Sequence, residues 1–284
     1  MMTTTDSIPQ RPRISVSTWS LHRTLGDPQI YGADRGRDVP TTTHGRGVLS
    51  LLELPAQLAA FGIHTLEICH FHLPRLDAGY CAELRSALQS ANVELFSLLV
   101  DEGDITHPEH AARDLAWISS WLDVASALGA KRVRVIAGKA APSEAALAMS
   151  IRGLQSLLPR AEARGLRLMT ENWYGLLSSP APVHTLLERL EGNVGLCFDF
   201  GNWRGPAKYG DLQSIAPYAE SCHAKAFFAP SGEMEQNDYK HCLDITRSAG
   251  FSGPYTLIYD GPSSDEWAGL AQERLVVEPY IATP

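Results

Sequence analysis

Short apolar runs, many of them rich in β-branched residues, recur along the chain, and each is followed by a loop and an amphipathic stretch. From the second run onward the spacing is roughly 25 to 40 residues, the length of a strand with its crossover helix. We predict strands at Ile14–Trp19, His64–Cys69, Glu94–Val100, Arg132–Ala137, Arg167–Glu171, Gly195–Phe200, Cys222–Ala226 and Tyr255–Asp260. Eight alternating units favour a closed α/β barrel, a (β/α)₈ TIM barrel, over an open doubly wound sheet, although both obey this alternation.

Apolar residues at helical spacing fill the intervals between these runs. Ser143 is a suitable N-cap, without the Glu or Gln that would complete a capping box. Glycines expected just after helix ends are Gly129, Gly165 and Gly250. The predicted helices are Pro108–Leu128, Ser143–Ala163, Asp211–Glu220 and Asn237–Ala249, with a further helix that begins near Ser50.

One segment departs from this rhythm and gives the chain its expected organisation. Residues 26–47, rich in Gly, Asp, Arg and Thr, separate the first strand from the helix near Ser50. Because this loop follows a strand, we expect it at the C-terminal face of the barrel, where barrel active sites are built. It is either a functional lid or a surface excursion. Residues 1–284 are predicted to form one domain, with residues 1–12 as a polar N-terminal extension.

The composition limits the classes of partner. The net charge of −8 leaves no basic surface for phosphate backbones, so we expect no nucleic-acid partner. No apolar run is long enough to span a membrane, and the N-terminus lacks the apolar core of a signal peptide. The five cysteines form no CxxC pair, which favours a reducing cytoplasm over a disulfide framework. A homo-oligomer is compatible with the sequence.

Ionisable side chains stand at the ends of several predicted strands, namely Glu67, Glu171, Asp199, His223 and Asp260. The strand ends of a barrel meet at one mouth, where several carboxylates would repel one another unless a cation neutralised them. We therefore predict one divalent metal ion (Mn²⁺, Mg²⁺, Co²⁺ or Zn²⁺) held by Glu171, Asp199, His223 and Asp260. Taken singly, Glu171 is as well explained as a salt-bridge partner, Asp199 as a helix cap and His223 as a core histidine.

The motifs that carry a family resemblance are Glu171–Asn172, Asp199-x-Gly201–Asn202 and His223-x-Lys225. In this order and spacing, the chain resembles the xylose-isomerase-like barrel superfamily of sugar (phosphate) isomerases and epimerases. In such enzymes the matching Glu, Asp and His bind one metal, and a Glu on strand eight completes the set. The carboxylates of strands five and eight also move protons in that superfamily.

Strand eight departs from the family pattern. If Gly253–Pro254 aligns with the family's opening of this strand, Ile258 occupies the ligand position. Asp260 shares the face of Ile258, because residues i and i+2 of a strand point the same way. We predict that Asp260 replaces the missing carboxylate, with a cap on the Gly261–Pro262 turn as the alternative. Two-base epimerisation needs a base on each face of the carbon, and Ile258 weighs against it.

The resemblance implies a metal-dependent isomerase or epimerase that acts on a small sugar, ketose or keto-polyol through an enediolate. Glu171 and Asp260 are the expected proton-transfer residues. The residues expected to bind substrate are Glu67, His72, Asn202, Lys225, Trp19 and Trp173, although both tryptophans also suit core packing. The alternatives are a dehydratase on the same scaffold, a metal-poor sugar-binding or regulatory protein, and a multi-zinc DNA-repair endonuclease, which the negative charge disfavours.

Overall fold

Eight parallel strands form a closed barrel in the computed structural model, which describes residues 11–29, 32–34 and 44–282. Each strand pairs with the next in sequence, and β8 closes the barrel against β1. The strands are β1 (Arg13–Ser17), β2 (Thr65–Cys69), β3 (Glu94–Val100), β4 (Arg132–Val135), β5 (Arg167–Glu171), β6 (Gly195–Asp199), β7 (Ala219–Lys225) and β8 (Pro254–Ile258). The predicted (β/α)₈ barrel is confirmed.

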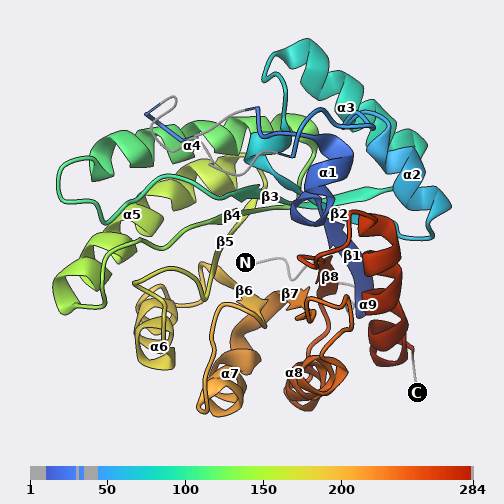
Figure 1. The fold of residues 1–284 in the computed structure, drawn as a ribbon. Helices are drawn as coiled ribbons and strands as arrows, with labels where there is room; N and C mark the ends of the chain where they lie inside the picture. The colour runs from blue at the N-terminus through green and yellow to red at the C-terminus, as the bar shows by residue number, and fades with distance from the viewer. Residues whose placement is uncertain (1–10, 30–31, 35–43, 283–284) are drawn as a thin grey trace, which may run out of the picture.

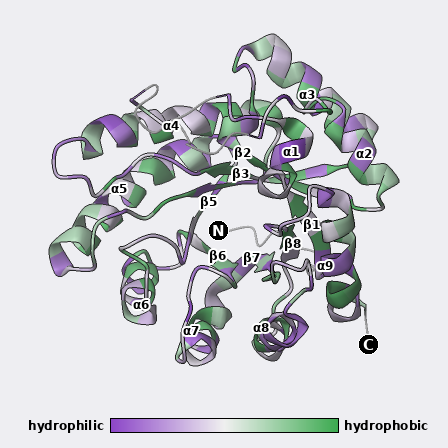
Figure 2. Ribbon diagram, viewed as in Figure 1, coloured by the Kyte–Doolittle hydropathy of each residue, from purple (hydrophilic) through white to green (hydrophobic). Residues whose placement is uncertain are grey.

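Helices surround the strands in sequence order (Figure 1). They are α1 (His22–Leu25), α2 (Leu54–Ala60), α3 (Ala78–Ser90), α4 (Ala111–Leu128), α5 (Glu144–Ala163), α6 (Pro180–Arg189), α7 (Lys208–Ile215), α8 (Gln236–Ser248) and α9 (Glu266–Ile281), with 3₁₀ turns η1 (Thr18–Leu21), η2 (His70–His72) and η3 (Ala216–Tyr218). The helices of the ring carry both hydrophobic and hydrophilic residues, as helices with one buried face do (Figure 2). Within the described part of the chain, no helix has the length and apolar character needed to cross a membrane.

Local signals explain where several elements end. The Ser143 hydroxyl accepts a hydrogen bond from the amide of Ala146, which confirms the predicted N-cap. Gly129 adopts the left-handed conformation at the end of α4, with φ 82°. The predicted helix Asp211–Glu220 was wrong at its end. The chain turns into η3 at Pro217, which has no amide hydrogen to continue a helix, and β7 has begun by Ala219.

Buried apolar and polar residues alternate along the strands, which places them on opposite sides of the barrel wall. Apolar residues such as Val16, Leu66 and Leu257 belong to the main core, which lies between the barrel and its helices. The buried polar residues on the inward positions include Ser15, Ser17, Glu67, Arg134, Glu171, Asp199, His223 and Thr256. The inside of the barrel is therefore polar, and its charges need partners.

The two ends of segment 26–47 lie side by side. Gly26 pairs with Arg46 in an antiparallel bridge, and Asp27 Oδ1 accepts hydrogen bonds from the amides of His44 and Gly45. The Gly26 conformation has φ 87°, and a Cβ there would lie 2.4 Å from the amide nitrogen of Gly47, so only glycine fits. Residues 30–31 and 35–43 of the predicted lid, and residues 1–10 of the predicted extension, lie outside the described residues.

Candidate metal centre and active site

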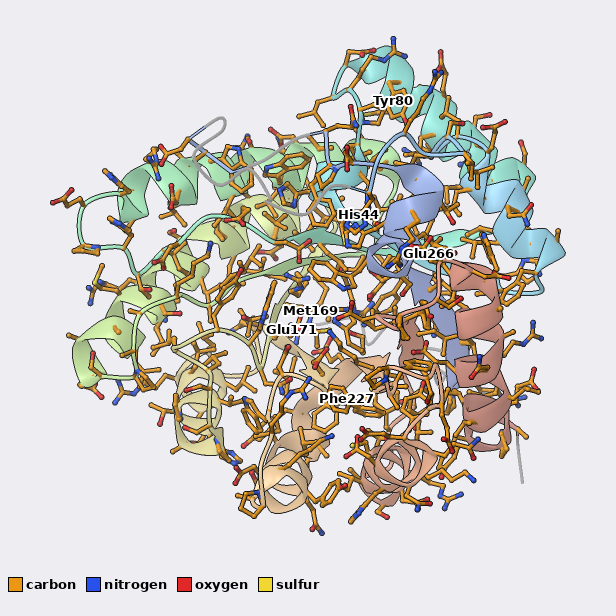
Figure 3. All side chains as sticks on the ribbon, viewed as in Figure 1. His44, Tyr80, Met169, Glu171, Phe227 and Glu266 are labelled. Carbon is orange, nitrogen blue, oxygen red and sulfur yellow. The ribbon has the colours of Figure 1, made fainter. Side chains whose placement is uncertain are left out.

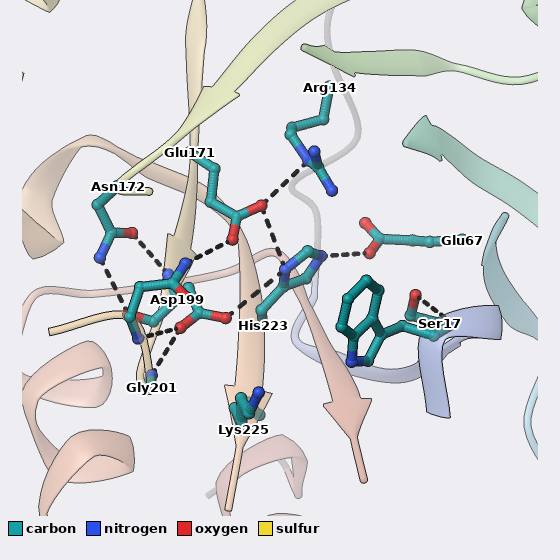
Figure 4. A network of polar contacts seen from close by, with 12 residues as sticks. Ser17, Glu67, Arg134, Glu171, Asn172, Asp199, Gly201, His223 and Lys225 are labelled. Carbon is teal, nitrogen blue, oxygen red and sulfur yellow. Dashed lines mark hydrogen bonds and ion pairs between the residues drawn. The ribbon is translucent and has the colours of Figure 1, made fainter. Parts of the chain in front are cut away.

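Side chains from three neighbouring strands converge at the mouth of the barrel. Glu171 ends β5, Asp199 ends β6 and His223 lies on β7, and all three are buried. His223 Nδ1 lies 3.5 Å from Glu171 Oε2 and 3.8 Å from Asp199 Oδ2 (Figure 4). Two ligands of one ion lie about 3 Å apart or slightly more when each bond is about 2.1 Å long. His223 Nδ1 is thus at a ligand-like distance from the Glu171 carboxylate and slightly farther from that of Asp199.

Glu67 controls the orientation of the His223 ring. Its carboxylate on β2 accepts a 2.9 Å hydrogen bond from His223 Nε2, and it is fully buried. With the Nε2 proton engaged in this way, Nδ1 carries the free lone pair of the neutral ring and faces Glu171 and Asp199. Metal-binding histidines commonly have such a carboxylate partner, which fixes both tautomer and ring orientation. We predicted Glu67 as a substrate-binding residue, and its contact in the structure is with His223.

The two oxygens of Asp199 have separate tasks. Oδ1 accepts hydrogen bonds from the amides of Gly201 and Asn202, at 2.6 and 2.7 Å, and these bonds hold the loop after β6. Asn172 exchanges two hydrogen bonds with the backbone of Asp199. Oδ2 remains on the side of His223. Asp199 therefore holds the turn after β6 and does not cap the next helix, whose N-cap is Ala207, while it presents its second oxygen to the site.

Arg134 is a buried cation beside these carboxylates. Its Nε lies 3.0 Å from Glu171 Oε2, and its Nη2 donates a 2.5 Å hydrogen bond to Asp101 Oδ1. Asn202 Nδ2 donates to the other oxygen of Glu171 at 2.8 Å. Glu171 lies inside the ring of helices (Figure 3) and is held from both sides. Glu171 therefore forms a salt bridge with Arg134, which was the alternative explanation for this residue, and it also faces His223.

The sequence interpretation missed three residues of this site, Asp101, Arg134 and Cys197. Glu171, Cys197 and His223 offer ligand atoms that all lie within 4.8 Å of one another. Strand periodicity was the available signal for Cys197, which stands two residues before Asp199 and shares its face. Arg134 is a charge between two buried valines, and Asp101 directly follows an apolar strand.

A pocket of about 110 Å³ opens above these groups. Its lining residues are Ser17, Trp19, Cys69, Leu99, Asp101, Arg134, Glu171, Trp173, Asp199, Asn202, His223, Lys225 and Ile258. Trp19, Trp173, Asn202 and Lys225 are thus brought to the pocket, among the residues predicted to bind substrate.

His72 and Asp260 lie apart from the three donors. The His72 ring is buried against His22 and Phe71, its Nδ1 bonds Thr18 Oγ1, and it is not among the lining residues. Asp260 has a 59% exposed side chain, and its Oδ2 lies 2.9 Å from Lys225 Nζ. The structure therefore pairs Asp260 with Lys225 at the rim, two residues beyond Ile258.

The donor set suits a divalent cation. Glu67, Asp101, Glu171 and Asp199 are four buried carboxylates, and the buried cations against them are Arg134 and, when protonated, His70 and His223. Oε2 of Glu171 is buried and makes no hydrogen bond. The negative charge in excess, together with a mixed oxygen and nitrogen donor set, matches the preferences of Mn²⁺, Mg²⁺, Co²⁺ and Zn²⁺.

The family follows from comparison with known proteins. The family model of the xylose isomerase-like TIM barrel matches residues 55–276. The chain belongs to this family. This match confirms the family resemblance that the motifs indicated. No curated protein matches the chain.

Several solved structures of similar fold match nearly the whole length of this chain. A xylose isomerase domain protein from Planctomyces limnophilus is 18% identical, with a TM-score of 0.67 and coverage of 96% of this chain and 98% of that one. A xylose isomerase-like TIM barrel protein from Mycobacterium smegmatis, in complex with magnesium, is 17% identical, with a TM-score of 0.65 and coverage of 95% and 98%. D-allulose 3-epimerase from Methylomonas sp. is 15% identical, with a TM-score of 0.68 and coverage of 96% and 99%. At these identities the likeness concerns the fold.

In this xylose isomerase-like barrel, the protonation of Glu171, Asp199 and His223 depends on their burial and on the charges beside them. Burial raises the pKa of Asp199 to about 6, and the nearby Glu171 adds to the effect. Burial also raises the pKa of Glu171, but Arg134 and His223 outweigh it and hold the net pKa below its ordinary value. Burial lowers the pKa of His223, but Cys197, Glu171 and Glu67 outweigh it and raise that pKa well above its ordinary value.

Cation binding is therefore expected to release protons from Asp199 and His223. Metal ligands must be deprotonated, so a proton on Asp199 below pH 6 competes with the cation. We expect the Kd for Mn²⁺ to rise as the pH falls, about tenfold per pH unit where His223 alone carries a competing proton and about 100-fold per unit below pH 6, where Asp199 carries a second one. Calorimetric titrations at pH 5 to 7.5, in buffers of different ionisation enthalpy, measure both the Kd and the released protons. A Kd that stays constant over this range contradicts the assignment.

Proposed function

We propose that this family member is a divalent-metal-dependent isomerase or epimerase that acts on a small sugar, ketose or keto-polyol. The observation that carries the proposal is the convergence of Glu171, Asp199 and His223 at a pocket that Trp19 and Trp173 also line. Structures of similar fold include D-allulose 3-epimerase and L-ribulose 3-epimerase, whose names supply the class of substrate.

The residues of the pocket have distinct roles in this proposal. A divalent cation held by Glu171, Asp199 and His223 would supply Lewis acidity beside a substrate carbonyl. Glu171 removes the proton from the carbon beside the carbonyl, while Asn202 holds its second oxygen at 2.8 Å. Lys225 binds a substrate oxygen at the rim, and its side chain crosses Gly201, where a Cβ would come within 2.8 Å of Lys225 Cδ. The tryptophan rings cover the C–H face of the sugar.

We propose Glu171, Asp199 and His223 as the protein ligands, and Asp260 as the partner that orients Lys225. Replacing Asp260 with asparagine is then expected to leave the Kd for Mn²⁺ within about twofold of the parent value, because a ligand or its close partner would cost tenfold or more. A metal titration of the Asp260→Asn variant measures this directly. A loss of tenfold or more would instead establish Asp260 as the strand-eight ligand that the sequence predicted.

Exchange of a carbon-bound proton with solvent tests the proposed function. We expect deuterium to enter at least one sugar at the carbon beside its carbonyl when the Mn²⁺-loaded protein is incubated in D₂O with ketoses, inososes and keto-glycosides. Proton NMR of each sugar measures the incorporation, and the Glu171→Gln variant, which keeps the shape of the side chain without its base, is the control at a Mn²⁺ concentration that gives it the same metal content as the parent protein. Absence of deuterium from every sugar while Mn²⁺ is bound would refute the enzyme and favour a sugar-binding protein. Loss of water from a labelled substrate would identify the dehydratase alternative.

A further inference from the structure

The pocket has two chemically different walls. The charged and hydrogen-bonding wall, which runs from the end of β3 to β7, consists of Asp101, Arg134, Glu171, Asp199, Asn202, His223 and Lys225, with the ring of Trp173 among them. The uncharged wall, which runs from β8 through β1 and β2 to β3, consists of Ile258, Ser17, Trp19, Cys69 and Leu99. Ile258 stands in register with Lys225, so the apolar wall begins directly beside the charged one. A substrate bound in this pocket would contact ionisable groups on only one of its own faces.

The uncharged wall holds no group suited to accept a proton from carbon, among the residues that the structure describes there. Burial raises the pKa of the Cys69 thiol well above its ordinary value, so it stays protonated. Glu67 comes from the same half of the barrel, but it is fully buried, does not line the pocket and is bonded to His223 Nε2. Asp260 is exposed at the rim and paired with Lys225.

We infer that the site moves protons on one face of its substrate, and that it therefore shifts a proton between neighbouring carbons of a hydroxy-aldehyde or hydroxy-ketone sugar instead of inverting one carbon. Inversion requires removal of the proton on one face and return on the other, which needs a group on each side. A shift between two adjacent carbons needs only one carboxylate, and Glu171 stands on the charged wall for this task. This inference rests on the proposed function and makes Ile258 a specificity-determining residue.

The step balances without any further reactant. The C–H bond beside the carbonyl breaks, its proton passes to the Glu171 carboxylate, and its electron pair forms the carbon–carbon double bond while the carbonyl electrons move to oxygen. Glu171 then returns the proton to the former carbonyl carbon on the same face. The proton of the neighbouring hydroxyl moves to the former carbonyl oxygen, and the hydroxyl carbon becomes the new carbonyl. An aldose thus becomes the corresponding ketose.

Isotope transfer within the sugar tests this inference on the unmodified protein. Tetroses, pentoses and hexoses that carry deuterium at carbon 2 are incubated in H₂O with the Mn²⁺-loaded protein and followed by NMR. We expect ketose with part of the deuterium carried to a single prochiral position of carbon 1, and no epimeric sugar. Formation of C2 or C3 epimers at a rate equal to or above isomerisation overturns the inference. Absence of any exchange or transfer, with Mn²⁺ bound, instead refutes the proposed function on which it rests.

Placing a carboxylate on the uncharged wall provides the matched gain-of-function experiment. The Ile258→Glu variant supplies a base opposite Glu171, and we expect at least tenfold more epimer from it than from the parent protein. Ile258→Gln has the same shape without the base and is expected to form no epimer. Equal epimer formation by both variants, or none by a folded and metal-loaded Ile258→Glu protein, counts against Ile258 as the determinant. Circular dichroism and metal content verify the fold of each variant, and the isotope transfer of the parent protein decides the inference if Ile258→Glu fails to fold.

Discussion

Replacing His223 with alanine is expected to weaken the binding of Mn²⁺ by more than about 100-fold. The change removes the only nitrogen donor that we assign to the centre, the Nδ1 that lies 3.5 Å from Glu171 Oε2 and 3.8 Å from Asp199 Oδ2. Loss of a residue that only orients a metal ligand lowers metal affinity 10- to 100-fold, so loss of the ligand itself should lower it further. Titration with Mn²⁺ followed by metal analysis of the dialysed protein measures the change.

Two further variants separate a ligand from a structural role. Glu67→Gln keeps an oxygen that accepts the His223 Nε2 hydrogen bond but removes its charge, and we expect a loss of about tenfold in affinity. His241 is an exposed histidine that stacks on Tyr209 on the surface, and alanine there should leave the Kd unchanged. Full metal occupancy in a folded His223→Ala protein would rule out this centre.

Replacing Arg134 with methionine is expected to lower the free energy of unfolding by about 3–5 kcal/mol at neutral pH. Arg134 is the buried cation that joins Asp101 and Glu171, and methionine of similar length would leave both carboxylates without it. Burial alone raises the pKa of Asp101, but Arg134 and His70 together outweigh it and hold that pKa well below its ordinary value. Urea unfolding followed by circular dichroism measures the loss.

The difference in stability between the parent protein and the Arg134→Met variant is expected to depend on pH. In the parent protein the lowered pKa of Asp101 contributes stability that is present above about pH 4 and is lost as the pH falls through the folded value. Without Arg134, His70 remains to oppose the effect of burial, so we expect the pKa of this carboxyl to rise and the variant to lose less stability than the parent protein as it takes up the proton in mild acid. The difference between the two proteins should therefore narrow from pH 7.5 to pH 5, and a difference that widens is the opposite of what we expect.

A double variant and a surface variant complete this experiment. Arg134→Met combined with Asp101→Asn removes the uncompensated charge and should recover part of the lost stability, because the two residues are in contact. Arg247 forms an exposed ion pair with Asp244 on α8, and methionine there should change stability little. An equal loss for Arg247→Met would show that the effect is not specific to the buried site.

Much of the architecture is determined by the sequence pattern alone. Apolar runs at regular spacing predict eight parallel strands because each strand needs a crossover helix of similar length. The same pattern places Glu171 and Asp199 at strand ends and His223 on the next strand, and parallel strands in a barrel present all their C-terminal ends at one mouth. The meeting of these three side chains was therefore predictable, as was Ile258 in place of a carboxylate, whereas the binding of a metal by them stays a prediction.

Side-chain pairing across the barrel was decided only by the tertiary structure. Glu67 and His223 are 156 residues apart, and nothing local in either segment shows that β2 and β7 place them 2.9 Å from each other. In the sequence, Arg134 is a single charge in a short strand. Only the closed barrel places it between Asp101 and Glu171. Asp260 shares the face of Ile258 by periodicity, but β8 ends at Ile258 and Lys225 holds the aspartate at the rim. Periodicity specifies the face of a side chain, whereas the partner depends on strand register, chain ends and the charges that meet there.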